Sequence, residues 1–279
     1  WSGVVHVDLR LLFAAGARAP YAVAVPGGAP PSLCHPTPTP PRQEPRRTMP
    51  SPRAVVLETF AEHRCSAILR TRDPDAVRPA LEAAIAGGFR IVEVTMTTPD
   101  CLDHIAALRE RRELTVGVGT VLSVDDAKEA MAAGAQFLVS PVTDPQIVTF
   151  CRQHDLVSVP GAFTPTEMMT AHKAGADIVK LFPGPANGPA FVRAVRGPLP
   201  FLRIFPTSGV DEHNCLGWLE AGAFGLGFVG SLFDPDDLAG HRFDQIAARA
   251  ARMVQKVRAA APAKPAADVE DEVARTATA

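Results

Sequence analysis

The sequence predicts an α/β protein with the (β/α)8, or TIM-barrel, fold, built as a single domain with an extra N-terminal helix. After Met49, eight short apolar runs alternate with helical segments, which is typical of a parallel sheet covered on its outer face. Ala-Gly pairs recur just before these runs, where a C-cap glycine turns the chain towards the next strand. The chain has 279 residues, and about 250 residues is typical of one such barrel. The count of eight favours a closed barrel over an open, doubly wound sheet.

The barrel elements are predicted in order along residues 51–260. An amphipathic helix at 51–64 comes first, before the first apolar run. The predicted strands are apolar runs bounded by turn residues, and they lie at 66–70, 91–98, 115–121, 137–142, 156–161, 177–184, 202–209 and 225–233. The predicted helices follow them in turn, at 73–88, 99–112, 123–135, 144–155, 164–176, 189–195, 211–223 and 235–260. Asp73 is expected to cap the helix at 73–88, and Gly87 and Gly88 to end it.

The composition is typical of a globular protein, with 47% hydrophobic and 21% charged residues. The net charge of -2 predicts no broad basic surface, so nucleic acid is not an expected partner. No apolar run approaches the roughly 20 residues that cross a membrane, so no membrane partner is expected. The cysteines are odd in number and dispersed, which fits a reducing compartment better than a disulfide framework.

No cofactor is expected from the motifs. The histidines show neither HxH nor HExxH spacing, so a metal site is not predicted. The stretch GVGTVLSVDD begins like a dinucleotide-binding fingerprint, but it lacks the third glycine and the fold context.

The two ends of the chain are predicted to lie outside the barrel. Residues 1–50 are rich in proline and arginine and poor in acidic residues, so we expect a disordered leader. This composition is typical of an organelle transit peptide, while a translated leader before a true start at Met49 explains it equally well. We therefore expect the protein in the cytoplasm, or in a plastid or other organelle if the leader is a transit peptide. Residues 261–279, rich in alanine and proline, are predicted to be a disordered tail.

Lys180 interrupts the apolar run of the sixth predicted strand, where a lysine is seldom buried without a partner. Glu93 lies inside the second predicted strand, where a carboxylate is costly unless it is partnered. A buried lysine has a lowered pKa, so its neutral amine can attack a ketone and form a Schiff base while a nearby carboxylate moves protons. The alternative is a structural Lys180–Glu93 ion pair without chemistry, and the two residues alone leave both interpretations open.

Two turns predict a phosphate site. Ser208 and Gly209 end the seventh predicted strand, and Gly230 and Ser231 end the eighth. In TIM barrels the active site lies at the C-terminal ends of the strands, and the loops after strands seven and eight commonly bind phosphate. Each turn alone is a weak signal, whereas both together at matching strand ends are more specific. A lysine and a phosphate site in one barrel indicate a phosphorylated keto acid as substrate.

These segments resemble the class I 2-keto-3-deoxy-6-phosphogluconate (KDPG) aldolases, a family that includes the 4-hydroxy-2-oxoglutarate (KHG) aldolases. The resemblance spans about residues 51–260 and is carried by GGFRIVEVTMTTP, VGVGTVLSVDDAKEAMAAGAQFLVSP, VPGAFTPTEMMTAHKAGADIVKLFP, FPTSGV and VGSLF. It implies a homotrimeric TIM barrel that cleaves a 2-keto-3-deoxy sugar acid phosphate to pyruvate and glyceraldehyde 3-phosphate. Lys180 is then the Schiff-base lysine and Glu93 the general acid and base. The implied substrate-binding residues are Thr120 and Pro141 at the pyruvate site, Phe182 beside the imine, and Ser208, Gly209 and Ser231 at the phosphate.

The chain departs from the family pattern at Thr97, where many members carry an arginine that binds the substrate carboxylate. Arg70 ends the first predicted strand, and some relatives carry an arginine there. Because the first strand lies beside the second, we expect Arg70 to bind the carboxylate; the other interpretation is a solvated strand-end residue. Without an arginine at position 97 the carboxylate site is weaker, so an alternative function is also open. In that alternative the chain is a non-catalytic or differently specialised barrel that binds phosphate ligands.

Overall fold

The computed structural model describes residues 50–260, in which strands and helices alternate. The strands are β1 (Cys65–Leu69), β2 (Ile91–Thr95), β3 (Thr115–Gly119), β4 (Phe137–Val139), β5 (Val157–Val159), β6 (Gly161–Ala162), β7 (Val179–Leu181), β8 (Ile204–Pro206) and β9 (Leu226–Phe228). The helices are α1 (Pro52–His63), α2 (Pro74–Ala86), α3 (Cys101–Arg109), α4 (Val124–Ala132), α5 (Pro145–Gln153), α6 (Pro165–Ala174), α7 (Pro189–Arg196), α8 (Cys215–Glu220), α9 (Pro235–Ala239) and α10 (Phe243–Ala259).

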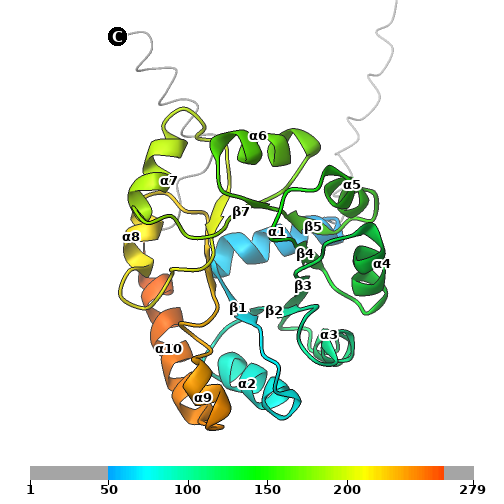
Figure 1. Cartoon of the computed structure of the whole chain (residues 1–279), viewed down its shortest axis with the longest axis vertical. Helices are drawn as coiled ribbons and strands as arrows, with labels where there is room; N and C mark the ends of the chain where they lie inside the picture. The colour runs from blue at the N-terminus through cyan, green and yellow to red at the C-terminus, as the bar shows by residue number, and fades with distance from the viewer. Residues whose placement is uncertain (1–49, 261–279) are drawn as a thin grey trace, which may run out of the picture. The chain divides into compact units, whose positions relative to one another are not determined.

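The strands form a closed parallel barrel with eight positions, because β5 and β6 are two pieces of one strand. Pro160 separates them, since a proline has no N–H group to donate to a neighbouring strand. Pairing runs β5-β4-β3-β2-β1-β9 in one sheet and β6-β7-β8 in the other. A parallel bridge between Thr207 and Gly227 joins the end of β8 to β9. Figure 1 shows the outer helices arranged around this ring of strands, which confirms the predicted TIM barrel.

The extra helix α1 closes the N-terminal end of the barrel and crosses the middle of the ring in Figure 1. The Phe60 ring of α1 meets Phe137 and Phe205 edge-on, with ring centroids 5.1 and 5.7 Å apart. Arg53 of the same helix forms two hydrogen bonds with the buried Asp177, which precedes β7. The same apolar cluster also holds Val56, Ile91, Val139, Val157, Val159 and Ile178. The helix therefore supplies both the apolar plug and the ion pair at this end.

Side-chain caps start several of the helices, and the cap predicted at Asp73 is confirmed. The Asp73 carboxylate accepts a backbone N–H group at the start of α2. Ser123 forms a capping box with Asp126 at the start of α4, and Thr164 does so with Glu167 at the start of α6. These caps place each helix start directly after a loop at the C-terminal ends of the strands.

The single long helix predicted at 235–260 is wrong, because this segment forms two helices, α9 and α10. Gly240 follows α9, and His241 has a left-handed backbone with φ 51°. A residue in that conformation cannot continue a right-handed helix, so the chain turns before α10 begins. The N–H group of Arg242 then donates to the carbonyl of Asp237 at 2.8 Å and fixes the turn.

Two predicted segments fall outside the described residues. They are the leader at 1–50, apart from Pro50, and the tail at 261–279, so both stay predictions. Within residues 50–260, no helix is both long and apolar enough to pass through a membrane.

Candidate active site

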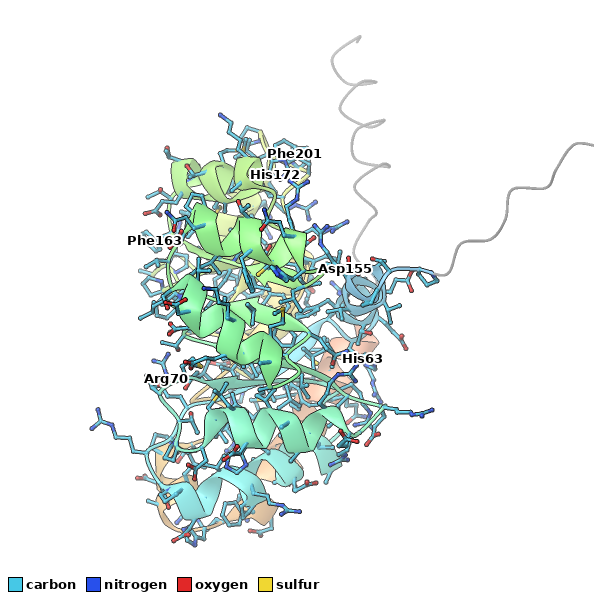
Figure 2. The ribbon with its side chains drawn as sticks, turned by 90° about the vertical axis from the view of Figure 1, so that its right-hand side faces the viewer. His63, Arg70, Asp155, Phe163, His172 and Phe201 are labelled. Carbon is cyan, nitrogen blue, oxygen red and sulfur yellow. The ribbon has the colours of Figure 1, made fainter. Side chains whose placement is uncertain are left out.

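A cavity of about 360 Å³ opens at the C-terminal ends of the strands. Figure 2 shows Arg70 on one edge of the barrel and His63 and Asp155 on the opposite edge. His63 is the last residue of α1, and Asp155 accepts a hydrogen bond from Ser51, the N-cap of the same helix. The cavity and the α1 plug therefore lie at opposite ends of the barrel. The cavity brings together eight of the residues predicted from the sequence, namely Arg70, Glu93, Lys180, Phe182, Ser208, Gly209, Gly230 and Ser231.

Lys180 is the middle residue of β7, and only 7% of its surface is exposed. Burial lowers the pKa of its ammonium group, the negative charge of Glu93 opposes that effect, and the positive charge of Arg70 reinforces it. The Nζ atom lies 5.2 Å from the centre of the Phe182 ring. Free amine is therefore available at a lower pH than for an exposed lysine.

Glu93 is the central residue of β2 and is 2% exposed. Burial raises the pKa of its carboxyl group, while the charges of Lys180 and Arg70 lower it. The Oε1 atom is buried and has no hydrogen-bond partner in the described part of the chain. Glu93 and Lys180 line one cavity without forming a direct ion pair. A buried carboxylate oxygen left without a partner is costly, and the barrel nevertheless keeps this one in a residue that lines the cavity.

Gly119, at the end of β3, makes room for the Glu93 carboxylate. A Cβ atom added to Gly119 would lie 2.0 Å from Glu93 Oε1, so any side chain there would displace the carboxylate. Sequence reasoning did not select this residue. A glycine inside a predicted strand does signal a close approach, but the sequence does not say to which group.

Arg70 directly follows β1, and its side chain reaches the cavity. Its Nη2 atom donates to Thr120 Oγ1 at 3.1 Å, and Thr120 has a left-handed backbone with φ 60°. Thr97 is exposed and lies outside the cavity lining, with its Oγ1 atom 3.1 Å from Thr95 Oγ1. Thr120 and Pro141 also lie outside the lining. The arginine, and not Thr97, is therefore the residue that the barrel places near Lys180 and Glu93.

The turns after β8 and β9 form the other side of the cavity. Ser208 and Gly209 have left-handed backbones, with φ 74° and 73°. The N–H groups of Gly209, Gly230 and Ser231 donate no hydrogen bond within residues 50–260, so they are available to an anion. The Ser231 hydroxyl donates to the Val210 carbonyl at 2.6 Å, which ties the two turns together and occupies the hydroxyl proton.

The cavity also has lining residues that were not predicted as site residues. The Asp211 carboxylate accepts the N–H groups of His213 and Asn214, at 2.7 and 2.9 Å, and so organises the loop before α8. The apolar members gave no signal, because an apolar strand-end residue looks like any other core residue in a sequence. The unpredicted residues are Ile68, Thr207, Val210, Asp211 and Val229.

Other chemistry has little support in this part of the chain. Among residues 50–260, no three His, Cys, Asp or Glu side chains lie together where they could hold a metal ion. Burial raises the pKa of the Cys65, Cys101 and Cys151 thiols to about 12, so these cysteines are poor nucleophiles. The cavity instead pairs a lysine amine with a carboxyl group, which suits imine formation and proton transfer.

Comparisons with known proteins agree with this chemistry. The family model for KDPG and KHG aldolase matches residues 56–248. A 2-dehydro-3-deoxy-phosphogluconate aldolase from Treponema pallidum is 40% identical over 145 residues, which cover 51% of this chain and 69% of that protein. A 2-dehydro-3-deoxy-6-phosphogalactonate aldolase from Escherichia coli is 31% identical over 197 residues, which cover 70% of this chain and 94% of that protein.

The fold is also found among solved structures. A structure described as native KDPGal is 30% identical and superposes with a TM-score of 0.64, covering 70% of this chain and 94% of that one. These matches identify the protein as a carbon–carbon lyase of the aldolase type. The chain belongs to the KDPG and KHG aldolase family.

Proposed function

We propose that the protein is a class I aldolase in which the Lys180 amine forms the Schiff base and the Glu93 carboxyl group transfers the protons. The observation that carries this proposal is a buried lysine with a lowered pKa beside a buried carboxylate oxygen that has no partner. The relatives compared above are all named as aldolases, which does not favour a non-catalytic barrel.

The reaction follows from these two groups. The neutral Lys180 amine attacks the C2 keto carbon of the substrate to give a carbinolamine. The Glu93 carboxyl group protonates the carbinolamine hydroxyl, which leaves as water, so that a protonated imine and a Glu93 carboxylate remain. Glu93 takes the proton of the C4 hydroxyl, the C3–C4 bond breaks, and its electron pair moves into the imine to form an enamine while the aldehyde leaves. The Glu93 proton then goes to C3 of the enamine. Hydrolysis of the resulting imine releases pyruvate and returns the free amine.

The proposed substrate is 2-dehydro-3-deoxy-6-phosphogluconate or a close 2-keto acid analogue, cleaved to pyruvate and glyceraldehyde 3-phosphate. The named relatives support a phosphorylated keto acid of this kind. In the proposed complex the phosphate binds the backbone N–H groups of Gly209, Gly230 and Ser231, three residues that line the same cavity as Lys180. The Ser231 hydroxyl contributes by holding the turns together rather than by donating to the phosphate, because it already donates to Val210.

We assign the substrate carboxylate to Arg70. A guanidinium can bind a carboxylate through two parallel, charge-assisted hydrogen bonds, and Arg70 lines the cavity next to Glu93. Its bond to Thr120 Oγ1 holds it in place, which also gives Thr120 an indirect part in the pyruvate site. Phe182 packs beside the amine, while Thr97 and Pro141 keep only supporting roles outside the cavity lining.

The function is tested by Lys180→Arg. A guanidinium remains protonated at any working pH and cannot form the imine. We expect pyruvate release from the phosphorylated substrate, followed by coupled lactate dehydrogenase, to fall roughly 10⁴-fold or more. Lys173→Arg, an exposed lysine on α6, is the matched control and should retain full activity. Substantial turnover by a folded Lys180→Arg protein would refute the imine mechanism.

The role of Arg70 is tested by Arg70→Met with Arg72→Met as control, since Arg72 is exposed in the adjacent loop. Removing the Arg70 charge raises the Lys180 pKa, so the onset of borohydride trapping with pyruvate should move to higher pH. Loss of the carboxylate contact should in addition weaken trapping above that pH, where the amine is free in both proteins. If trapping recovers fully at high pH, Arg70 acts through its charge alone and does not bind the carboxylate.

We also propose a homotrimer, as the family resemblance implies. Large apolar side chains that are exposed in the chain by itself support assembly, since Leu122, Val142 and Phe163 follow neighbouring strands and are 56%, 52% and 40% exposed. Light scattering at micromolar concentration should give three times the mass of the chain. A stable monomer would contradict the proposal.

A further inference from the structure

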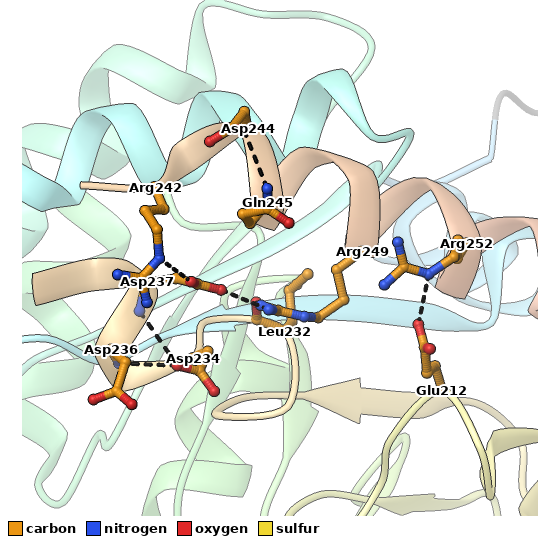
Figure 3. A network of polar contacts seen from close by, with 10 residues as sticks. All are labelled: Glu212, Leu232, Asp234, Asp236, Asp237, Arg242, Asp244, Gln245, Arg249 and Arg252. Atoms are coloured by element: carbon orange, nitrogen blue, oxygen red, sulfur yellow. Dashed lines mark hydrogen bonds and ion pairs between the residues drawn. The ribbon is translucent and has the colours of Figure 1, made fainter. Parts of the chain in front are cut away.

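The turn after β9, residues 229–233, is held from its outer side by α10 (Figure 3). Within the turn, the N–H groups of Leu232 and Phe233 both donate to the Val229 carbonyl, at 3.0 and 2.8 Å. The Leu232 carbonyl accepts a hydrogen bond from Arg249 Nη1 of α10 at 2.8 Å. Val229, Gly230 and Ser231 line the cavity. One turn therefore contacts the cavity on one side and a charged side chain of the outer helix layer on the other.

Arg249 is itself fixed by Asp237 of α9. Its Nη2 atom lies 2.5 Å from Asp237 Oδ2, and Arg242 Nε lies 2.7 Å from Asp237 Oδ1. The bond from Arg249, with the second guanidinium of Arg242, holds the pKa of this buried carboxyl group below its usual range. Because the planar guanidinium bonds the carboxylate and the Leu232 carbonyl at once, its orientation is fixed. Figure 3 shows Arg249 between these two partners.

The turn after β9 has little packing on its cavity side. Gly230 is exposed, and no atom lies within 4 Å of the position that a Cβ would take. Glycine loses more conformational freedom than any other residue when its backbone is fixed. The bond of the Ser231 hydroxyl to Val210 holds one side of the turn, and the bond from Arg249 holds the other.

We propose that Arg249 is a positioning residue for the phosphate of the substrate, because it holds the turn so that the N–H groups of Gly230 and Ser231 face the cavity. This inference rests on the proposed function, which supplies a phosphorylated substrate. Arg249 does not line the cavity, and Lys180 and Glu93 lie on other strands. Its effect is therefore confined to the end of the substrate that carries the phosphate.

The test compares Arg249→Met with Arg258→Met. Arg258 lies on the same helix, is exposed, and is not part of the Asp237 network. Each protein is assayed for turnover of the phosphorylated substrate and of its dephosphorylated analogue, and for borohydride trapping with pyruvate alone. For Arg249→Met we expect the KM for the phosphorylated substrate to rise about tenfold or more, since small displacements of binding groups have effects of this size. Turnover of the analogue and pyruvate trapping should not change, and Arg258→Met should match the parent protein.

Two results would overturn the proposal. One is an unchanged KM for the phosphorylated substrate. The other is an equal loss with the dephosphorylated analogue and in pyruvate trapping, which indicates a general structural role. If Arg249→Met does not fold, Arg249→Lys decides, because an ammonium keeps the pair with Asp237 but lacks the fork that also reaches Leu232. Arg249→Lys should raise the KM for the phosphorylated substrate to a smaller extent than is expected for Arg249→Met. An unchanged KM in Arg249→Lys would also overturn the proposal.

Failure of the proposed function gives a different result. In that case the parent protein itself forms no adduct with pyruvate. The inference about Arg249 is then decided by calorimetric titration with inorganic phosphate, which requires no aldol chemistry. Weaker phosphate binding by Arg249→Met than by Arg258→Met supports the positioning role, and equal binding overturns it.

Discussion

The burial of the Lys180 amine beside a Glu93 carboxyl group with one unpartnered oxygen is the constraint on which the rest of the structure depends. A direct ion pair would satisfy both groups and keep the lysine charged, since an adjacent carboxylate raises its pKa. The barrel instead places them on β7 and β2, lining one cavity without a direct ion pair. Burial then acts most strongly on each group, lowering the lysine pKa and raising that of the carboxyl. Burying these two groups without a direct ion pair lowers the stability of the fold, so other parts of the structure must offset that loss.

The opposite end of the barrel supplies that stability. There α1 inserts Phe60 among the interior aromatic rings, and Arg53 pairs with Asp177. The same strand thus begins after a hydrogen-bonded acidic residue, Asp177, and carries the buried Lys180 further on. The outer helices contribute in a second way, because Arg249 on α10 bonds the turn after β9, part of which lines the cavity. The packing of α1 at one end of the barrel and the bond from Arg249 behind the turn after β9 both stabilise the fold from outside the cavity. The groups that line the cavity therefore remain available to a ligand.

Much of this was predictable from sequence, because periodicity and caps are local properties. Eight apolar runs with helix signals between them were enough for the barrel, and the polar residues inside strands identified Lys180 and Glu93. Contacts between residues that are far apart in the sequence could not be predicted from these local patterns. The role of Gly119 depends on which side chain of the neighbouring strand faces it, and the support of Leu232 by Arg249 joins residues from separate elements. The break between α9 and α10 depends on the left-handed backbone of His241, which is uncommon for a residue other than glycine.

The central claim is that one buried amine carries the chemistry, and peptide mapping of the trapped enzyme tests it most directly. The protein is incubated with pyruvate, reduced with borohydride and digested, and the modified lysine is located by mass spectrometry. The account predicts a single reduced pyruvate adduct, on Lys180, while the exposed Lys128 and Lys173 remain unmodified. An adduct on another lysine, or the absence of an adduct from folded protein, would contradict it.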